Sequence, residues 1–599
     1  MKVLFRFIEK KEARFLFLAA VFSLLQAILS LRIPKIMGEI TTLLTTNTGT
    51  VDGIARTGLL MLLFAFLSLI ASIVVGFLAA IISATVSKRM RSALFQKIMS
   101  FSGEEINDFS AASLITRCTK DVTMIEKLVS ASIQVIFFAP IMAVVSVCMM
   151  IGSGGLWVGV TALTLAIMAA VLFTLLQKVK PHVAAVQRNT DALNQVGREH
   201  VGGIKVVHGF NAYEHQRARA GKATDDLSGS LLSVQRLNLA LIPFANAMVN
   251  LLSVLIYIIG AYLIHRAAGQ EKIALFSDMV AFSSYAALAT TAFMFMIMIY
   301  IAGILAFASM GRVREVLDRE ITITDPKEEK TPSAERGTIE FRNVSFRYPG
   351  SGEDALKDIC FRVEPGQTVA IIGATGCGKT TLLNLIPRMF DASRGEVLVD
   401  GVDVRDYRLK NLRNRIGYVP QRSILFSGTI AENIDYAEAD GFKRTLRDIQ
   451  RAAEIGQAKD FIEKKKDAYQ ARVEQGGANF SGGQKQRLTI SRAICREPEI
   501  YLFDDSFSAL DFKTDRALRE RLRESAGDAT MLIVAQRIAT IRNADNILVI
   551  DEGRLVGQGT HQELMRSCAV YQEIALSQLD EEEQEEARRL MAAPEGGRS

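Results

Sequence analysis

Residues 368–381, TVAIIGATGCGKTT, decide the fold of the C-terminal half of the chain. The apolar run Thr368–Ile372 predicts a buried strand, and the apolar stretch after Thr381 predicts a helix. Between them the sequence matches GxxxxGK[ST] in the strand, loop and helix setting that this motif requires. Glycines let backbone N–H groups approach phosphate oxygens, and the helix N-terminus adds positive potential. The stretch therefore predicts an α/β domain that binds a nucleotide.

Each position of this loop is a candidate for contact with ATP and Mg²⁺. We expect Lys379 to reach the β- and γ-phosphate oxygens and Thr380 to ligate Mg²⁺. The nucleotide-binding candidates are Gly373, Ala374, Thr375, Gly376, Cys377, Gly378, Lys379, Thr380 and Thr381.

Three later segments supply polar groups suited to the same ligand. The buried-strand pattern at 500–503 ends in Asp504, a carboxylate able to hold Mg²⁺ through water. Gln421 follows the predicted strand Ile416–Val419. The segment Ser481-Gly482-Gly483-Gln484 opens a predicted helix, so its hydroxyl and amides suit contact with a γ-phosphate.

The N-terminal half is predicted to lie in a membrane. Hydrophobic residues make up 49% of the chain, and the long charge-free runs lie before residue 312. A bilayer crossing needs about 20 apolar residues in a helix. The runs are 15–31, 57–87, 128–177, 237–264 and 279–311. The third is too long for one crossing and contains Gly152, Gly154 and Gly155, so it predicts two helices and a total of six spans.

The basic residues predict the orientation. Lys and Arg gather before the first span and after the second, whereas residues 37–56 contain one basic residue. The N-terminus and everything after residue 311 should therefore be cytoplasmic. A cleaved signal peptide is disfavoured because no small-x-small pattern follows the first span. Residues 1–12 alternate apolar and basic types, which predicts an amphipathic helix on the inner surface.

Composition disfavours several other classes. The net charge of +6 comes from Lys and Arg clustered between apolar runs, which favours membrane topology over nucleic-acid binding. The six cysteines form no CxxC pair, so neither a zinc site nor a disulfide framework is predicted. The spans carry no charged residue in their interiors, which argues against ion-coupled transport. The last span contains Phe293, Met294, Phe295, Met296, Met298 and Tyr300, a soft surface suited to apolar ligands or simply to packing.

The membrane spans and the nucleotide-binding motifs, in the order in which they occur along the chain, resemble those of ABC exporters. The resemblance covers essentially the whole chain. It implies that Tyr348 stacks on adenine, that Gln421 senses Mg²⁺ and the γ-phosphate, and that residues 481–484 form the family signature. Residues 508–511, Ser-Ala-Leu-Asp, match the family's dimer-contact loop. The resemblance also implies that residues 102–110 and 207–216 are coupling helices, each touching an ATPase domain.

Two catalytic positions depart from the family pattern. Where the family has the glutamate that polarises the attacking water, this chain has Asp505, and where it has a histidine near the γ-phosphate, this chain has Gln536. Phe480, where family members usually carry Leu, and the loop 471–477 are milder departures. Since hydrolysis needs a water positioned in line with the γ-phosphate, we expect ATP to bind this chain's own site but to turn over slowly.

The predicted protein is thus a membrane α-helical domain fused to an α/β P-loop ATPase. Its predicted parts are 1–12, an amphipathic helix; 13–315, the transmembrane domain; 316–337, a linker; 338–578, the nucleotide-binding domain; and 579–599, an acidic tail. It resembles the degenerate subunit of heterodimeric bacterial exporters, which implies an inner-membrane location, a second half-transporter as partner, contact with membrane lipids, and a lipophilic or amphipathic substrate. A slow homodimeric exporter and an ATP-gated channel or regulatory protein remain open, as does the import direction.

Overall fold

The chain forms two compact units. The computed structural model describes residues 4, 6–46, 50–151, 155–332, 336–436, 444–525, 527–578 and 584. The membrane unit comprises Met1–Met99 and Ala111–Arg319, and the C-terminal unit comprises Ser100–Ser110 and Glu320–Ser599. The chain therefore enters the C-terminal unit twice, the first time only for the short segment Ser100–Ser110.

Parts of three sequence predictions lie outside the described residues. These are positions 1–3 and 5 of the amphipathic segment, positions 152–154 of the turn between two spans, and the tail 579–599 except Gln584. In the described part of the amphipathic segment, Arg6 and Phe7 form a turn, and the first long helix begins at Lys10.

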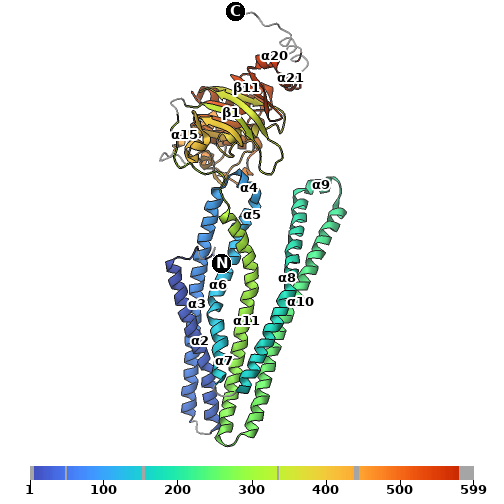
Figure 1. Cartoon of the computed structure of the whole chain (residues 1–599). Helices are drawn as coiled ribbons and strands as arrows, with labels where there is room; N and C mark the ends of the chain where they lie inside the picture. The colour runs from blue at the N-terminus through green and yellow to red at the C-terminus, as the bar shows by residue number, and fades with distance from the viewer. Residues whose placement is uncertain are drawn as a thin grey trace, which may run out of the picture. The chain divides into compact units, whose positions relative to one another are not determined.

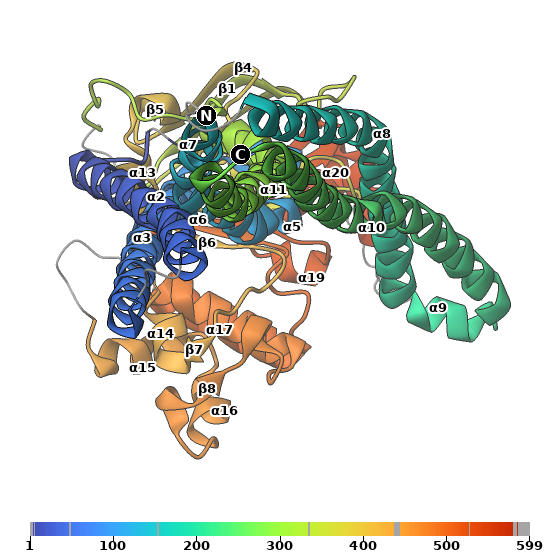
Figure 2. The ribbon, with the colours of Figure 1, turned by 90° about the horizontal axis from the view of Figure 1, so that it is seen from below.

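The membrane unit is built from long helices, as its apolar runs require. They are α2 (Lys10–Thr45), α3 (Val51–Met99), α5 (Ala111–Thr116), the π-helical turn η1 (Arg117–Asp121), α6 (Val122–Ile136), α7 (Phe138–Ile151), α8 (Gly155–Gly202), α9 (Ile204–Gly209), α10 (Tyr213–Arg266) and α11 (Gln270–Asp318). Figure 1 shows α8 and α10 as a hairpin that α9 closes. Figure 2 agrees that the α9 end of this hairpin lies apart from α3, α6 and α11.

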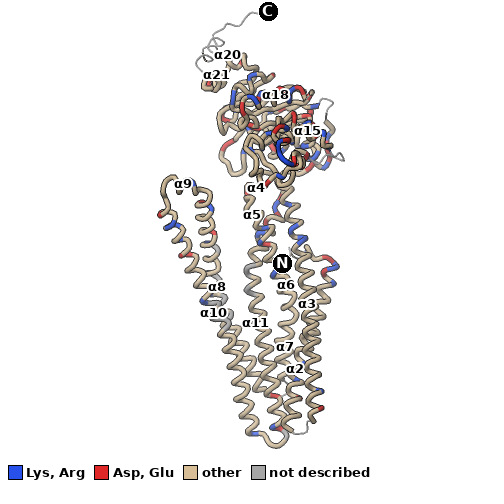
Figure 3. The backbone as a smooth tube through the Cα atoms, turned by 180° about the vertical axis from the view of Figure 1, so that it is seen from behind, with Lys and Arg blue, Asp and Glu red and all other residues tan. Residues whose placement is uncertain are grey.

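Five helices of the described chain are long and apolar enough to cross a membrane. The stretches are Lys10–Thr45, Val51–Met99, Ala111–Met150, Pro243–Arg266 and Glu271–Ile299, and a shorter apolar stretch, Gly155–Val171, opens α8. That shorter stretch is the fourth of the six predicted spans. Figure 3 shows long uncharged stretches in these helices and charged residues gathered toward the α9 end of the hairpin.

Two ion pairs join α11 to the π-helical turn η1. Asp121, nearly inaccessible to solvent, accepts hydrogen bonds from Ser309 Oγ at 2.9 Å and from Arg312 Nε at 2.8 Å. Arg117 donates to Glu315 Oε2 at 2.7 Å. A buried carboxylate with its partners satisfied holds a fixed geometry, so the end of α11 moves together with η1.

The C-terminal unit contains a mostly parallel sheet beside an antiparallel one. The six-stranded sheet has the order β12-β11-β3-β10-β9-β6, and the four-stranded sheet has the order β2-β1-β4-β5. The strands are β1 (Ile339–Phe346), β2 (Leu356–Val363), β3 (Thr368–Ile372), β4 (Arg394–Val399), β5 (Val402–Asp403), β6 (Ile416–Val419), β9 (Ile500–Asp504), β10 (Thr530–Val534), β11 (Asn546–Asp551) and β12 (Arg554–Gly559), with the small pair β7 (Gly428–Thr429) and β8 (Arg472–Val473).

The site lies at the carboxyl edge of the larger sheet. β3, β9 and β10 are parallel neighbours, with Val534 opposite both Ile371 and Asp504. Every residue of these three strands is buried. Their carboxyl ends therefore meet at one edge, the usual ligand position in such sheets.

Helices cover this sheet and carry the remaining motifs. They are α12 (Lys379–Leu385), α13 (Leu409–Asn414), α14 (Ile430–Ile434), α15 (Leu446–Ile455), α16 (Lys459–Glu463), α17 (Gly482–Cys495), α18 (Phe512–Ser525), α19 (Ile538–Ile541), α20 (His561–Ser567) and α21 (Ala569–Leu576). The early segment Ser100–Ser110 adds α4 (Gly103–Phe109) to the same unit.

Candidate nucleotide-binding site

The phosphate-binding loop joins β3 to α12, as the motif predicts. Gly376 and Gly378 have φ angles of +87° and +103°, a region that favours glycine. A Cβ at Gly373 would lie 2.0 Å from the carbonyl oxygen of Ile550, so this position also excludes a side chain. The glycines are thus required by the backbone path itself.

The Lys379 side chain folds back over the loop. Its Nζ donates to the carbonyl oxygens of Gly373 at 2.8 Å and Ala374 at 2.7 Å. Cys377 Sγ lies 3.7 Å from the same Nζ. The ammonium group therefore lies at the centre of the loop, where phosphate oxygens can replace the carbonyl oxygens as its partners.

Two candidate metal ligands are in direct contact. Thr380 Oγ1 donates to Asp504 Oδ1 at 3.0 Å, which joins the start of α12 to the end of β9. Burial raises the pKa of Asp504, and the neighbouring charge of Asp505 raises it further. A hydroxyl and a carboxylate oxygen at this distance are a ligand pair that suits Mg²⁺.

Asp505 is held by two amides. Gln536 Nε2 donates to its Oδ2 at 2.8 Å, and Gln421 Nε2 lies 3.5 Å from the same oxygen. The backbone of Asp505 is left-handed, with φ at +46°, which aspartate tolerates better than most residues. Burial raises the pKa of the Asp505 carboxyl, although hydrogen bonding partly offsets this.

These residues surround one cavity of about 400 Å³. Its wall consists of Tyr348, Ala355, Thr375, Gly376, Gly378, Lys379, Thr380, Thr381, Gln421, Asp504, Asp505, Val534 and Gln536. Gly373, Ala374 and Cys377 belong to the same loop but not to this wall. The sequence analysis did not identify Ala355 and Val534 as residues of the site.

Tyr348 contributes an aromatic ring to the wall of the cavity. Its hydroxyl is 2.9 Å from Thr381 Oγ1, and its ring meets the ring of Phe390 edge to face, with centroids 5.5 Å apart. Phe390 also packs against Phe346, at 5.5 Å. The ring of Tyr348 is thus oriented by its neighbours, as a stacking platform for a base needs to be.

The signature residues lie elsewhere in the unit. Ser481 caps α17: Gln484 N donates to its Oγ at 3.4 Å, and Ser481 N donates to Gln484 Oε1 at 3.1 Å. Ser481, Gly482, Gly483 and Gln484 do not line the cavity. A built Cβ on Gly483 would lie 3.3 Å from the carbonyl oxygen of Ala509, so the signature adjoins the 508–511 loop.

Comparisons with known proteins agree with this architecture. A family model described as "ABC transporter" matches residues 356–508, and one described as "ABC transporter transmembrane region" matches residues 16–293. An uncharacterized ABC transporter ATP-binding protein of Mycobacterium tuberculosis is 36% identical over 560 residues, covering 93% of this chain and 94% of the relative. The chain belongs to the ABC transporters.

Other relatives extend the comparison. YfiB of Bacillus subtilis, an uncharacterized ABC transporter ATP-binding protein, is 37% identical over 88% of this chain and 90% of its own length. The ATP-dependent lipid A-core flippase of Pseudomonas aeruginosa is 31% identical over 88% of this chain and 85% of its own length. The structure of a bacterial Atm1-family ABC exporter with ATP bound shares the fold, with a TM-score of 0.82 at 24% identity over 95% of this chain and 99% of that one.

Proposed function

We propose that this chain is one subunit of a heterodimeric ATP-driven exporter whose own ATP site hydrolyses slowly. The observation that carries the proposal is the bond between Gln536 and Asp505 at the wall of the nucleotide cavity. The position expected to act as catalytic base is therefore engaged by an amide, while the signature motif of the same chain is intact.

The residues of the cavity fit ATP and Mg²⁺. Thr380 and Asp504 would hold the metal ion, and Gln421 would complete its surroundings through its amide oxygen. The ion would neutralise charge on the phosphates. Lys379 and the N–H groups of the glycine loop would bind the phosphate oxygens, and Tyr348 would stack on the adenine.

Hydrolysis at this site should be slow for a geometric reason. Aspartate is one methylene shorter than glutamate, so the Asp505 carboxylate lies farther from a water in line with the γ-phosphate. Misplacement by about 1 Å can cost about a hundredfold in rate. An amide at Gln536 cannot carry the positive charge of a protonated histidine, so charge developing in the transition state is also less well stabilised.

A partner chain would supply the missing groups. The residues Ser481 and Gly482 are exposed at the N-terminus of α17, where they can meet the γ-phosphate of a second nucleotide-binding domain.

Two exposed apolar surfaces also suit a partner. One is the α9 region, where the side chain of Phe210 is 81% exposed; the other is the stacked pair Phe426 and Tyr436, with ring centroids 4.4 Å apart.

The proposed substrates are lipophilic or amphipathic molecules, with lipids as the leading class. Relatives named as lipid A-core flippases support this class. The run at 293–298 supports it as well: Phe293 and Met296 are half-buried and Met298 is exposed. Basic residues flanking the spans support an inner-membrane location with the ATP site in the cytoplasm.

Co-purification tests the assembly. The tagged chain, extracted from its native membrane in mild detergent, should bring down a second half-transporter with a catalytic glutamate and histidine, identified by mass spectrometry. The pair, reconstituted in lipid, should hydrolyse ATP faster than the chain alone. A homodimer with equal activity would favour the homodimeric exporter, and nucleotide binding without lipid-stimulated turnover would favour an ATP-gated channel or regulatory protein.

A further inference from the structure

The α4 segment carries a fully buried carboxylate. Glu105 is 0% exposed, and its Oε1 accepts hydrogen bonds from Thr322 N at 2.8 Å and Thr322 Oγ1 at 2.9 Å. Its Oε2 accepts from Ser102 N at 2.7 Å and from Ser102 Oγ. Burial alone would raise the pKa of Glu105, but these hydrogen bonds outweigh it and lower the pKa to about 2. The carboxylate is therefore ionised at every physiological pH and joins two segments far apart in sequence.

The residue that Glu105 holds, Thr322, lies within the predicted linker 316–337. Farther along, Arg388 Nη1 donates to the carbonyl oxygen of Thr324 at 3.1 Å, and Leu409 N donates to Asp325 Oδ1 at 2.8 Å. Both oxygens of Glu329 accept from Asn411 Nδ2 at 2.8 Å. Residues 322–330, which we call the strap, are thus hydrogen-bonded to the C-terminal unit at several points along their length.

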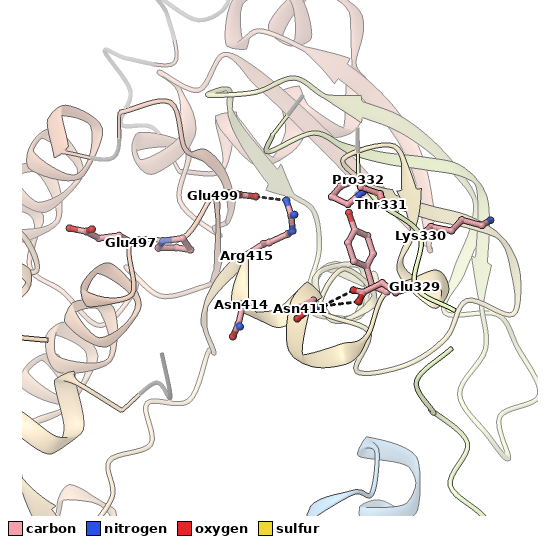
Figure 4. Close-up of a pocket in the computed structure, with 11 residues that line it drawn as sticks. Glu329, Lys330, Thr331, Pro332, Asn411, Asn414, Arg415, Glu497 and Glu499 are labelled. Atoms are coloured by element: carbon pink, nitrogen blue, oxygen red, sulfur yellow. Dashed lines mark hydrogen bonds and ion pairs between the residues drawn. The ribbon is translucent and has the colours of Figure 1, made fainter. Parts of the chain in front are cut away.

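A cavity of about 550 Å³ marks the end of this strap. Lys330, paired with Asp406 at 2.7 Å, lies on its wall with Thr331 and Pro332 (Figure 4). Across the cavity, Arg415 pairs with Glu499 at 2.8 Å and with Asp400 at 2.7 Å (Figure 4 draws the first pair). These charges already have partners, so we assign the cavity no ligand.

The other face of α4 meets the aromatic group beside Tyr348. A Cβ built on Gly103 would lie 2.8 Å from Cζ of Phe390, so the ring packs directly on the helix backbone. Phe390 in turn meets Tyr348 edge to face. A change in the position of Tyr348 when a base stacks on it can therefore reach α4 through one intervening ring.

The chain connects the segments that Glu105 ties together directly to the helices α3, α5 and α11. Ser100 follows the last residue of α3, Ser110 precedes the first residue of α5, and Glu320 is separated from the end of α11 by Arg319 alone. All three helix ends lead into the segments that Glu105 and Ser102 tie together.

We propose that Glu105 is a positioning residue for coupling: its carboxylate ties Thr322 to α4, so that α3, α5 and α11 respond as one body to the nucleotide. Without the tie, ATP would still bind and the change at Tyr348 would reach α4, but α11 would receive it only through its ion pairs with η1, so its response would be weaker.

The test uses the assembled transporter in lipid nanodiscs with Glu105→Gln. The amide offers one acceptor oxygen where four donors converge, so the tie should fail. We expect the Kd for ATP and the basal ATPase rate to stay within about twofold, whereas the ATP-dependent change in hydrogen exchange at residues 300–318 falls by about threefold or more. Thr322→Val, which removes only the hydroxyl donor, should lose part of that response. Glu104→Gln is the matched control, because the structure gives the Glu104 carboxylate no hydrogen bond or ion pair to any described residue.

A covalent tie should rescue the response. Ser102 Oγ and Thr322 Oγ1 lie 3.4 Å apart, close to the separation that a disulfide can bridge after a small shift. In the Glu105→Gln background, Ser102→Cys with Thr322→Cys should restore the exchange response when oxidised and lose it in reductant. Peptide mapping identifies the intended bond among the native thiols.

Two results would overturn the proposal. One is a full ATP-dependent exchange response in Glu105→Gln with normal nucleotide binding. The other is a response lost in Glu105→Gln that the Ser102–Thr322 disulfide, once formed, does not restore. If Glu105→Gln does not fold, the same readout on Thr322→Val decides, and an unchanged response there counts against the tie.

Discussion

Gln536 Nε2 lies 2.8 Å from Asp505 Oδ2, and this contact occupies the carboxylate from which a catalytic base would act. The two departures from the family pattern are therefore physical neighbours. Each compensates for the other in packing terms, because the shorter acid and the uncharged amide form a satisfied pair. We therefore expect a change at Asp505 or at Gln536 alone to restore the rate of hydrolysis only in part.

Restoring both family residues should increase hydrolysis at this site. Asp505→Glu lengthens the acid toward the γ-phosphate, and Gln536→His supplies an imidazole in place of the amide. We expect the double variant to raise turnover at this site by about tenfold or more, and each single variant to raise it much less. Single-turnover ATPase assays, with the partner's catalytic glutamate replaced by Gln, isolate the site. Equal gains from either single change would contradict the coupled pair.

The signature of this chain should matter more than its own base. In the proposed heterodimer, Gly482→Asp would place a negative charge beside the partner's γ-phosphate, which Ser481 and the N-terminus of α17 would contact, so steady-state ATPase activity should fall by about a hundredfold. Asp505→Ala should cost less than about threefold, because a misplaced base contributes little. Comparable losses from the two variants would show that Asp505 acts as a catalytic base, and they would favour the homodimeric exporter.

Lys379→Ala should weaken ATP binding at this site without stopping the transporter. The ammonium group is the loop's own cation, lying within 2.8 Å of two loop carbonyl oxygens. Its loss should raise the Kd of a fluorescent ATP analogue at this site by about tenfold or more. Most steady-state hydrolysis should persist at the other site. Complete loss of turnover while the partner's site still binds ATP would contradict a role limited to clamping the dimer.

Acid should selectively remove the stabilisation that Glu105 provides. The pKa of Glu105 in the folded state is about 2, below its ordinary value, so its contribution is complete above about pH 5 and is lost as the pH falls toward 2. At pH 7 we expect Glu105→Gln to lower the free energy of unfolding of the C-terminal unit by about 2 to 3 kcal/mol. Calorimetry at pH 7 and pH 4 should show the difference between variant and wild type shrinking. The same comparison with Glu104→Gln should show little difference at either pH.

The sequence predicted the elements that local pattern determines. Strand β3 occurs as Thr368–Ile372, as predicted, because a short apolar run followed by a glycine loop leaves few alternatives. The residues around the nucleotide cavity were predictable for a related reason: Asp504 and Gln536 lie at or just after the ends of parallel strands, and such ends share one edge. Their chemical roles stay predictions.

Contacts between distant segments could not be predicted in this way. Nothing near Glu105 indicates that its partner is Thr322, since a Glu near a helix start usually serves a capping box, which Glu105 also does here. Nothing in the sequence around Phe390 indicates that its ring lies between Tyr348 and α4. The hydrogen bond from Gln536 to Asp505 likewise depends on side-chain directions that spacing does not fix.

The return of Ser100–Ser110 into the C-terminal unit also has a consequence for biosynthesis. During synthesis α4 leaves the ribosome before Thr322, Arg388 and Phe390 have been made. The Glu105 carboxylate therefore has no bond to Thr322 until that later part of the chain is synthesised. A fragment beginning at Glu320 would therefore lack α4 and would expose the face of Phe390 that α4 covers. Because α4 lies in the chain between α3 and α5, we expect the C-terminal unit to reach its complete structure only after these two helices have been placed.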